Sequence, residues 1–306
     1  MAKLSGLPFA RQACIFISRF RFSFLMSIAP KRSQVVFQKL EQDLVKLSSK
    51  PPAENVHRFR TGTRRLQILL GELSPRLDRN QKKLLKSLGR IRKRAGKVRD
   101  LDVQLAALRS LKIPGEPRRK TQLVNRLIEL RAQQERKLRK AVDEDTVREI
   151  RKRLKRAGKN FNPEAGRDPL TVAKEMLAAI NKENVPVTEA LLHQYRILSK
   201  RARYAAEFAE PSVKTEQFIA GVKRIQDALG DWHDWLTLTQ TASEHLGEVR
   251  ESALVAELHN VTGAKFRRAV VLLSPMRAES ARALEHPLHP PARAMTKPIR
   301  PATSAA

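Results

Sequence analysis

A histidine followed by arginines at helical spacing marks the part of the sequence that could do the clearest chemistry. In VHRFRTGTRRL (residues 56–66), His57 precedes Arg60 by three positions, and Arg60 precedes Arg64 by four. On an α-helix, residues at these spacings lie one above another along one face. Arginine binds phosphate oxygens in bidentate fashion, and nearby phosphate favours the charged form of histidine. The spacing therefore indicates a site for a ligand with regularly spaced negative charges.

The same pattern returns in the second half of the chain. The segment LHQYRILSKRARYA places His193, Arg196 and Lys200 at the same spacing, 136 residues after the first set. A solvated helix face with a histidine at the edge of the core would explain one such helix. Its repetition favours a shared, phosphate-binding arrangement.

A second pair of segments extends the repeat. GRIRKRAGKVRDLDV aligns with KRIQDALGDWHDWLT at an offset of 134 residues, which pairs Arg90 with Arg224 and Gly96 with Gly230. The two offsets differ by two residues, the length of a small loop change. We therefore expect two halves of similar layout, each built around a helical bundle.

Each motif also carries an apolar stripe that must position it. At 100° per residue the stripe members share one face, and the His/Arg stripe is centred about 120° away. The two stripes are Val56, Phe59, Thr63, Leu66 and Leu70, and Leu192, Tyr195, Ser199, Ala202 and Ala206. Arg65 and Arg201 point closer to the opposite flank. Gly62 is unusual inside a helix, where it costs about 1 kcal/mol relative to alanine unless it permits a close approach.

Composition sets the fold class and the kind of partner. Leu, Ala, Arg, Lys, Glu and Gln dominate and favour helices, so we predict an all-α protein. Lys plus Arg total 61 against 31 Asp plus Glu, and the net charge of +30 indicates a polyanionic partner: DNA, RNA, anionic lipid or inorganic polyphosphate. The single cysteine, Cys14, excludes an internal disulfide and a cysteine-based zinc site. No run reaches the roughly 18 apolar residues of a membrane span.

Periodicity and proline positions divide the chain into helices. We predict helices at 31–49, 54–73, 78–95, 98–111, 117–141, 143–158, 168–184, 187–208, 213–229, 232–246 and 250–273. They form two pseudo-symmetric antiparallel helical bundles, about 31–160 and 168–285, with a long charged helical hairpin at 117–158. Residues 1–30 are basic, and a targeting segment or a true start at Met26 would explain them. Residues 286–306 are Pro/Ala-rich and predicted to be disordered.

Together these motifs resemble the CHAD family, the conserved histidine α-helical domains. VHRFRTGTRRL resembles its first signature, LHQYRILSKRARYAAEF its second, and KVRDLDV and IQDALGDWHD the two intervening ones. The resemblance covers residues 31–285 and implies two helical bundles that create a basic surface or pore for inorganic polyphosphate. It carries over to His57, Arg60, Arg64, Arg65, His193, Arg196, Lys200, Arg201 and Arg203. We add the aligned Arg90 and Arg224 to these candidate polyphosphate-binding residues.

The carboxylates next to the glycines are the other candidates for chemistry. We predict that Asp100, Asp102, Asp231 and Asp234 cap helix starts after the glycines or hold arginines in place. Magnesium coordination by Asp231 and Asp234 is the alternative. No HExxH, GxSxG, GxGxxG or P-loop motif occurs, and no ExExK triphosphatase strand. We predict no catalytic residue, metal or cofactor.

The leading hypothesis is a stand-alone, non-catalytic polyphosphate-binding protein of the cytoplasm. The hypothesis extends to association of the protein with polyphosphate granules. The first alternative is nucleic-acid binding, disfavoured because aromatic residues make up only 5% of the chain and few could stack on bases. The second is a metal-dependent phosphohydrolase that uses His57 and His193.

Overall fold

A computed structural model shows an all-helical chain in the residues that it describes. These are 28–48, 52–112, 116–180, 186–247 and 252–285, with side chains as far as residue 274. Its helices are α1 (Pro30–Ser48), α2 (Ala53–Ile68), α3 (Arg79–Ser110), α4 (Pro117–Arg139), α5 (Glu144–Lys159), α6 (Pro169–Ala178), α7 (Glu189–Ala206), α8 (Val213–Leu246) and α9 (Ala253–Glu285). A π-helical turn, η1 (Leu69–Leu73), extends α2. The all-α prediction is confirmed. The predictions for the N-terminal extension before residue 28 and for the tail 286–306 lie outside the described residues.

The two long helices correct the predicted boundaries. α3 and α8 run without a break through Gly96 and Gly230, where the sequence predicted new helices. Neither glycine has a positive φ; among the described glycines only Gly247 does, at the end of α8. A helical glycine costs only about 1 kcal/mol, which packing along a long helix readily offsets.

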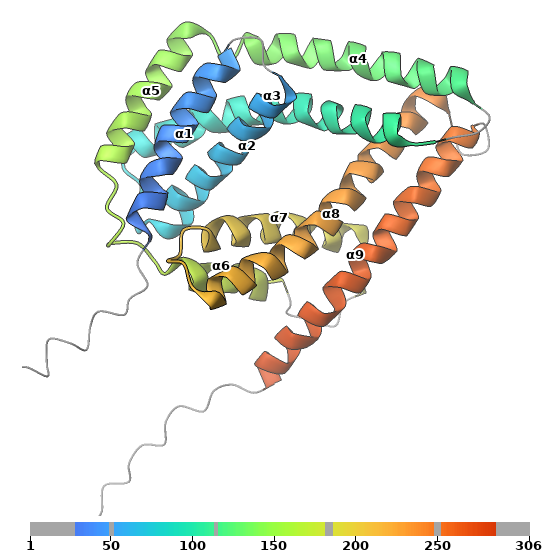
Figure 1. Cartoon of the computed structure of the whole chain (residues 1–306). Helices are drawn as coiled ribbons and strands as arrows, with labels where there is room; N and C mark the ends of the chain where they lie inside the picture. The colour runs from blue at the N-terminus through green and yellow to red at the C-terminus, as the bar shows by residue number, and fades with distance from the viewer. Residues whose placement is uncertain (1–27, 49–51, 113–115, 181–185, 248–251, 286–306) are drawn as a thin grey trace, which may run out of the picture.

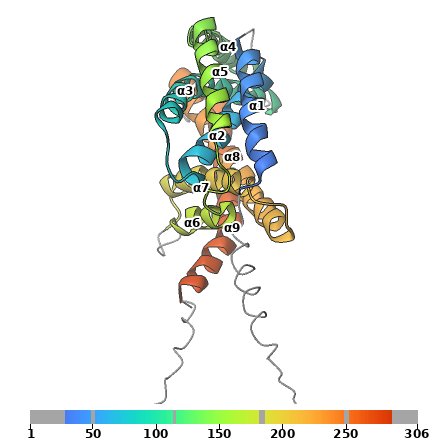
Figure 2. The ribbon, with the colours of Figure 1, turned by 90° about the vertical axis from the view of Figure 1, so that its left-hand side faces the viewer.

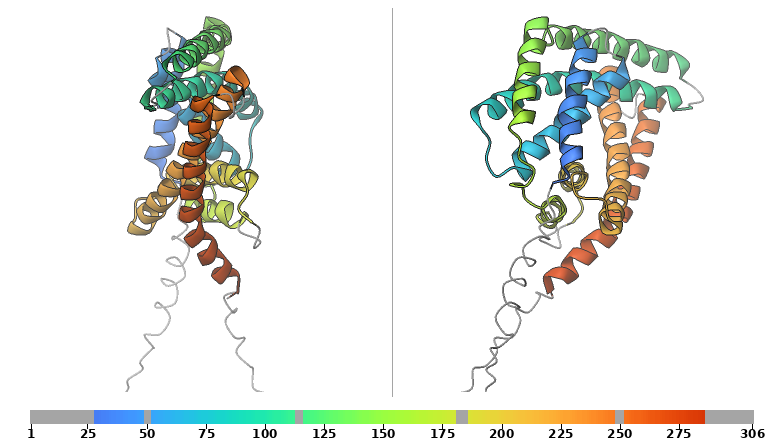
Figure 3. Two further views of the ribbon diagram at one scale, coloured as in Figure 1. Left: turned by 90° about the vertical axis from the view of Figure 1, so that its right-hand side faces the viewer. Right: turned by 60° about the vertical axis from the view of Figure 1, so that its left-hand side comes forward.

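The last helix is also longer than predicted. α9 was expected to end before Pro275, but it continues to Glu285. Figure 3 shows its axis bending toward the C-terminal end, the usual effect of a proline inside a helix. α6, by contrast, ends at Ala178, short of the predicted residue 184.

The two halves repeat one order of elements. In each, a helix packs on the motif helix, and the motif helix packs on a long helix: α1, α2 and α3 in the first half, α6, α7 and α8 in the second. Across the junction α2 contacts α7, and α3 contacts α8. Figures 1 and 2 show α4 and α9 following their long helices at the outside. A pseudo-twofold relation between the halves stays a prediction.

The charged segment predicted as a hairpin is α4 followed by α5. Each packs on α3 more than on the other, and α5 also packs on α1. Their apolar faces explain this, because Leu123 and Leu127 of α4 are buried near Leu108, whereas Ile150 and Leu154 of α5 enter the main core.

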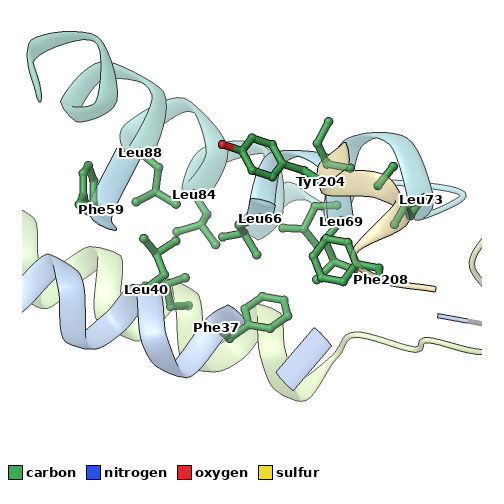
Figure 4. Close-up of a cluster of buried hydrophobic side chains, with 14 of the residues drawn as sticks. Phe37, Leu40, Phe59, Leu66, Leu69, Leu73, Leu84, Leu88, Tyr204 and Phe208 are labelled. Atoms are coloured by element: carbon green, nitrogen blue, oxygen red, sulfur yellow. The ribbon is translucent and has the colours of Figure 1, made fainter. Parts of the chain in front are cut away.

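A continuous apolar cluster joins the two halves. Figure 4 shows Tyr204 and Phe208, from the second half, packed beside Leu66, Leu69 and Leu73. Both apolar stripes predicted from the sequence are buried. The motif helices are therefore fixed by their apolar faces, and their His/Arg faces are left to other partners.

Gly62 permits the close approach of α1 to α2. A Cβ at this position would lie 3.3 Å from Leu40 Cδ1, tighter than an ordinary van der Waals contact. The absence of a side chain thus has a packing reason.

Within the described ranges, none of the helices combines the length and apolar character that a membrane span requires.

Candidate functional site

The two motif helices converge on one cavity. It has a volume of about 700 Å³, and α1, α2, α3, α7 and α8 contribute to its wall. A histidine, His57, and cations from both halves line it: Arg58, Arg60, Arg64, Arg65, Arg99, Arg196, Lys200 and Arg203, with Lys39 and Lys46 of α1. We call this the first cavity.

A second cavity of about 510 Å³ shares part of this wall. Its cations and histidine are Arg64, Arg92, His193, Arg196, Lys200 and Arg201. Four residues line both cavities, namely Arg64, Arg196, Lys200 and Tyr204. The two predicted cationic stripes therefore meet, but the histidines separate: His57 lines the first cavity and His193 the second.

Acidic residues of the long helices hold the two central arginines in equivalent ways. Arg60 Nη1 donates to Asp100 Oδ1 at 3.1 Å and to the carbonyl of Gly96 at 3.3 Å. In the second half, Arg196 Nη2 lies 4.0 Å from Asp234 Oδ1. Both aspartates stand inside continuous helices, so the predicted helix-capping role is wrong for them, and the alternative of holding arginines describes their contacts.

The other two aspartates tie the long helices to their outer partners. Asp102 Oδ1 accepts from Arg131 Nε at 2.5 Å, linking α3 to α4, and Asp231 Oδ2 accepts from Lys265 Nζ at 3.2 Å, linking α8 to α9. The carboxylates thus point to different neighbours. In the part of the chain that the structure describes, no group of three or more His, Cys, Asp or Glu could hold a metal ion.

Three predicted arginines are already paired with acids. Arg65 Nε donates to Glu207 Oε2 at 2.7 Å, and Arg203 pairs with the same carboxylate while donating to Gln226 Oε1 at 2.6 Å. Arg201 pairs with Glu72. These contacts cross between the halves or brace α7, so the three arginines stiffen the rim of the cavities as well as adding charge.

Tyr204 stands at the centre of this arginine cluster. Its ring lies 4.6 Å from the guanidinium of Arg203 and 5.6 Å from that of Arg65, and its hydroxyl accepts a hydrogen bond from Arg64. The ring packs at the edge of the apolar core in Figure 4. The tyrosine therefore connects the core to the wall shared by the two cavities.

The shared wall carries positive charge that the surrounding acids do not balance. Burial, followed by Arg196 and Arg64, lowers the pKa of Lys200 to about 7. Burial likewise lowers the pKa of Arg64, with Arg60 as the next cause, and that of Arg196, against the opposing effect of Asp234. Burial also raises the pKa of Asp234. An added anion would therefore stabilise the charged forms of these lysine and arginine side chains.

Two histidines near the site, His57 and His233, have lowered pKa values and favour the neutral form without a ligand. Burial, then Arg99, lowers the pKa of His57. His233, whose ring centroid lies 5.3 Å from that of His193, has a pKa of about 3 because of burial and then Arg196. Its Nδ1 is buried without a hydrogen-bond partner in the described structure.

Two predicted residues lie outside both cavities. Arg90 and Arg224 are exposed and line neither cavity. Each precedes the glycine of its long helix by six positions, which places it about 120° from that glycine around the helix axis. Their grouping with the central cations is therefore corrected: alignment paired them with each other but did not place them on the inner face.

Sequence reasoning missed Arg92 and Arg99. Arg92 lines the second cavity, its Nε is buried without a partner in the described structure, and burial lowers its pKa. Arg99 lines the first cavity. They stand four positions before and three after Gly96, the spacing of one helical face. The split of α3 into two helices hid this signal.

Comparison with known proteins identifies one family and two solved structures of similar fold. The family model for the CHAD domain matches residues 36–243. A crystal structure of the CHAD domain from the plant Ricinus communis is similar with a TM-score of 0.57 and 17% identity, covering 84% of this chain and 93% of that one. PptA from Streptomyces chartreusis gives a TM-score of 0.55 and 16% identity, covering 85% and 100%. At these identities the likeness concerns the fold. Comparison with curated protein sequences gave no match.

Proposed function

The chain belongs to the CHAD domain family, and we propose that it binds inorganic polyphosphate in the two cavities where its halves meet. Members of this family bind polyphosphate in general and are generally non-catalytic. The single observation that carries the proposal is the shared wall of Arg64, Arg196 and Lys200, which gathers cations from both repeats.

A phosphate polymer fits the electrostatics of this wall. Buried guanidinium groups without enough acidic partners are costly, and charge-assisted hydrogen bonds to phosphate oxygens offset that cost. Because the same residues line both cavities, one extended anion can contact them from either side. Arg92 and Arg196 each keep a buried Nε without a partner in the described chain, which a ligand oxygen could satisfy.

We propose binding without a chemical step. Asp100, Asp102, Asp231 and Asp234 each interact with a different cation of the protein, and in the described residues they do not converge with other acids or histidines on one metal site. We extend the proposal to a cytoplasmic protein that associates with polyphosphate granules, for which co-localisation of the tagged full chain with granules is the test.

Neutralising three arginines of the first cavity, two of which belong to the shared wall, tests the proposal. In the cavity variant, Arg60→Gln, Arg64→Gln and Arg196→Gln remove three charges with little change in volume. Each lost hydrogen bond to a charged group is worth about 1.5–3 kcal/mol, so the affinity for long polyphosphate should fall at least about a hundredfold. Titration calorimetry at fixed salt measures this, and circular dichroism checks that the helices persist.

A matched control distinguishes the effect of losing the site from the effect of losing net positive charge. Lys82, Lys83 and Lys86 are exposed on the N-terminal part of α3 and line neither cavity. Changing all three to glutamine removes the same charge and should lower the affinity by no more than about threefold, as expected for exposed charges. Equal losses in the two variants would contradict the cavity as the binding site.

Competition addresses the nucleic-acid alternative. Apart from His57 and His193, the only aromatic ring among the described residues that line the cavities is Tyr204, which is buried and already engaged with arginines, so few rings are left on which bases could stack. Bound polyphosphate should resist displacement by single-stranded or duplex DNA at matched phosphate concentration and fixed salt. Ready displacement would favour nucleic acid instead.

A further inference from the structure

A third basic concavity lies on the other side of α3. It has a volume of about 530 Å³ and runs between α3 and α4. Apart from Gln134 its lining is cationic: Arg90, Lys93, Arg94, Lys97 and Lys137. None of these residues lines the first or second cavity. We call this concavity the α3–α4 groove.

Helical geometry separates the groove from the cavities. At 100° per residue, the four α3 cations of the groove fall within a sector of about 100°, whereas Arg92 and Arg99 point about 180–200° from Arg90. A helix with its side chains is about 10–12 Å across. The groove and the cavities therefore lie back to back, with the thickness of α3 between them.

The groove cations differ from other surface cations nearby. Many exposed arginines of α4 and α5 are paired with an acid one turn away, as in Arg126 with Glu129 and Arg139 with Glu135. In the described structure no cation of the groove has an ion pair, and no acidic residue lines it. Like charges held together in this way repel one another, and an anion would relieve that repulsion.

One of these cations is fixed in place. Arg94 Nη1 donates to the backbone carbonyl of Lys137 at 2.9 Å, near the C-terminal end of α4. This bond holds α4 to α3 at the groove and orients the Arg94 guanidinium. A solvated basic face would need neither the concavity nor this link between the two helices.

We propose that the α3–α4 groove is a second binding site for inorganic polyphosphate, independent of the cavities. The identity of the ligand rests on the proposed function. The lining offers only ammonium, guanidinium and amide groups, which suit phosphate oxygens, and no aromatic ring on which a base could stack. With two separate sites, one protein molecule links two polyphosphate chains or two parts of a long one.

The test uses the full-length protein and a short polyphosphate of defined length. In the groove variant, Arg90→Gln, Lys93→Gln, Lys97→Gln and Lys137→Gln remove four charges and leave the Arg94 bond in place. Wild-type protein should show two binding events by titration calorimetry. The weaker belongs to the exposed groove and should disappear when salt rises from about 0.1 to about 1 M, where the Debye length shrinks from about 10 to about 3 Å.

The variants assign each event to its site. The groove variant should lose about ten- to hundredfold in affinity for the weaker event and keep the tighter one. The cavity variant should do the reverse. A control with Lys82, Lys83, Lys86 and Lys214 changed to glutamine removes the same charge at exposed positions and should retain both events.

The outcomes distinguish this inference from the proposed function. An unchanged stoichiometry in the groove variant overturns the groove site alone, and so does loss of both events in the cavity variant, since the groove would then not bind independently. Persistence of the tighter event in the cavity variant overturns the proposed cavity function instead. If the groove variant loses only duplex DNA binding, the groove is a nucleic-acid site and the proposal fails.

Discussion

Lys200 is the residue whose protonation we expect to be coupled to ligand binding. Its ammonium lies in the wall shared by the two cavities, and burial together with Arg196 and Arg64 lowers its pKa to about 7. Near neutral pH the ligand-free protein is therefore a mixture of charged and neutral Lys200. A polyphosphate in either cavity adds negative charge within reach of this group and must raise its pKa.

We predict that polyphosphate binding takes up a proton above pH 7. Because the pKa in the complex exceeds that of the free protein, affinity is full below about pH 7. It then falls by up to about tenfold per pH unit until the pKa of the complex is passed. Titrations in buffers of different ionisation enthalpy measure the proton uptake.

Substitution of Lys200 by arginine provides the matched comparison. Arginine keeps its charge across this pH range, so the Lys200→Arg variant should bind without that proton uptake and with a flatter pH profile. A variant that keeps the wild-type uptake would assign the proton to another group, such as His57.

The long helices tolerate the free-energy cost of a glycine in their interior. Gly230 lies inside α8 with helical backbone, and a Cβ added there meets no atom within 4 Å. Gly62 is also helical, but its Cβ would lie 3.3 Å from Leu40. The two glycines therefore have different reasons to be present, one of them unrelated to packing within the protein.

We predict that Gly230→Ala stabilises the ligand-free protein. Alanine in a helix interior is favoured over glycine by about 0.5–1 kcal/mol, and no contact opposes it here. Thermal unfolding should move up by about 1–4 °C. Gly62→Ala, the control, should gain less, because α1 must shift to accept the methyl group. A lower unfolding temperature for Gly230→Ala would contradict the open space seen at this position.

At the scale of elements, the sequence predicted the buried faces of helices better than it predicted where a helix is interrupted. The stripes around Val56 and Leu192 are buried as expected, since an apolar period of one helical turn leaves little choice. The continuity of α3 through Gly96 and of α8 through Gly230 was not predictable in the same way. A glycine signals a break only when no neighbour stabilises the helix across it, and that depends on tertiary contacts absent from a local pattern. Arg92 was missed for the same reason.

At the scale of the whole molecule, the repeat predicted two similar halves but not how the halves pack against each other. Which residues form the shared wall depends on how α2 packs against α7, and the spacing within one motif carries no information on that angle. The family resemblance implied a basic surface or pore but not its position, and both motifs line the cavities at the junction of the halves. The division of the two histidines between different cavities had no counterpart in the sequence.

The junction therefore combines apolar packing with electrostatic repulsion, which leads to opposite effects of one variant. Without ligand, the single variant Arg64→Gln relieves like-charge repulsion with Arg60 and breaks no ion pair among the described residues, so it should unfold at a higher temperature than wild type. With polyphosphate at about 100 times its dissociation constant, wild type should gain about 2.7 kcal/mol, or about 5–10 °C, while Arg64→Gln gains less. Differential scanning calorimetry with chloride at equal ionic strength as control measures both shifts. If chloride alone reproduces the gain, general screening rather than a bound polyanion balances the charge at the junction.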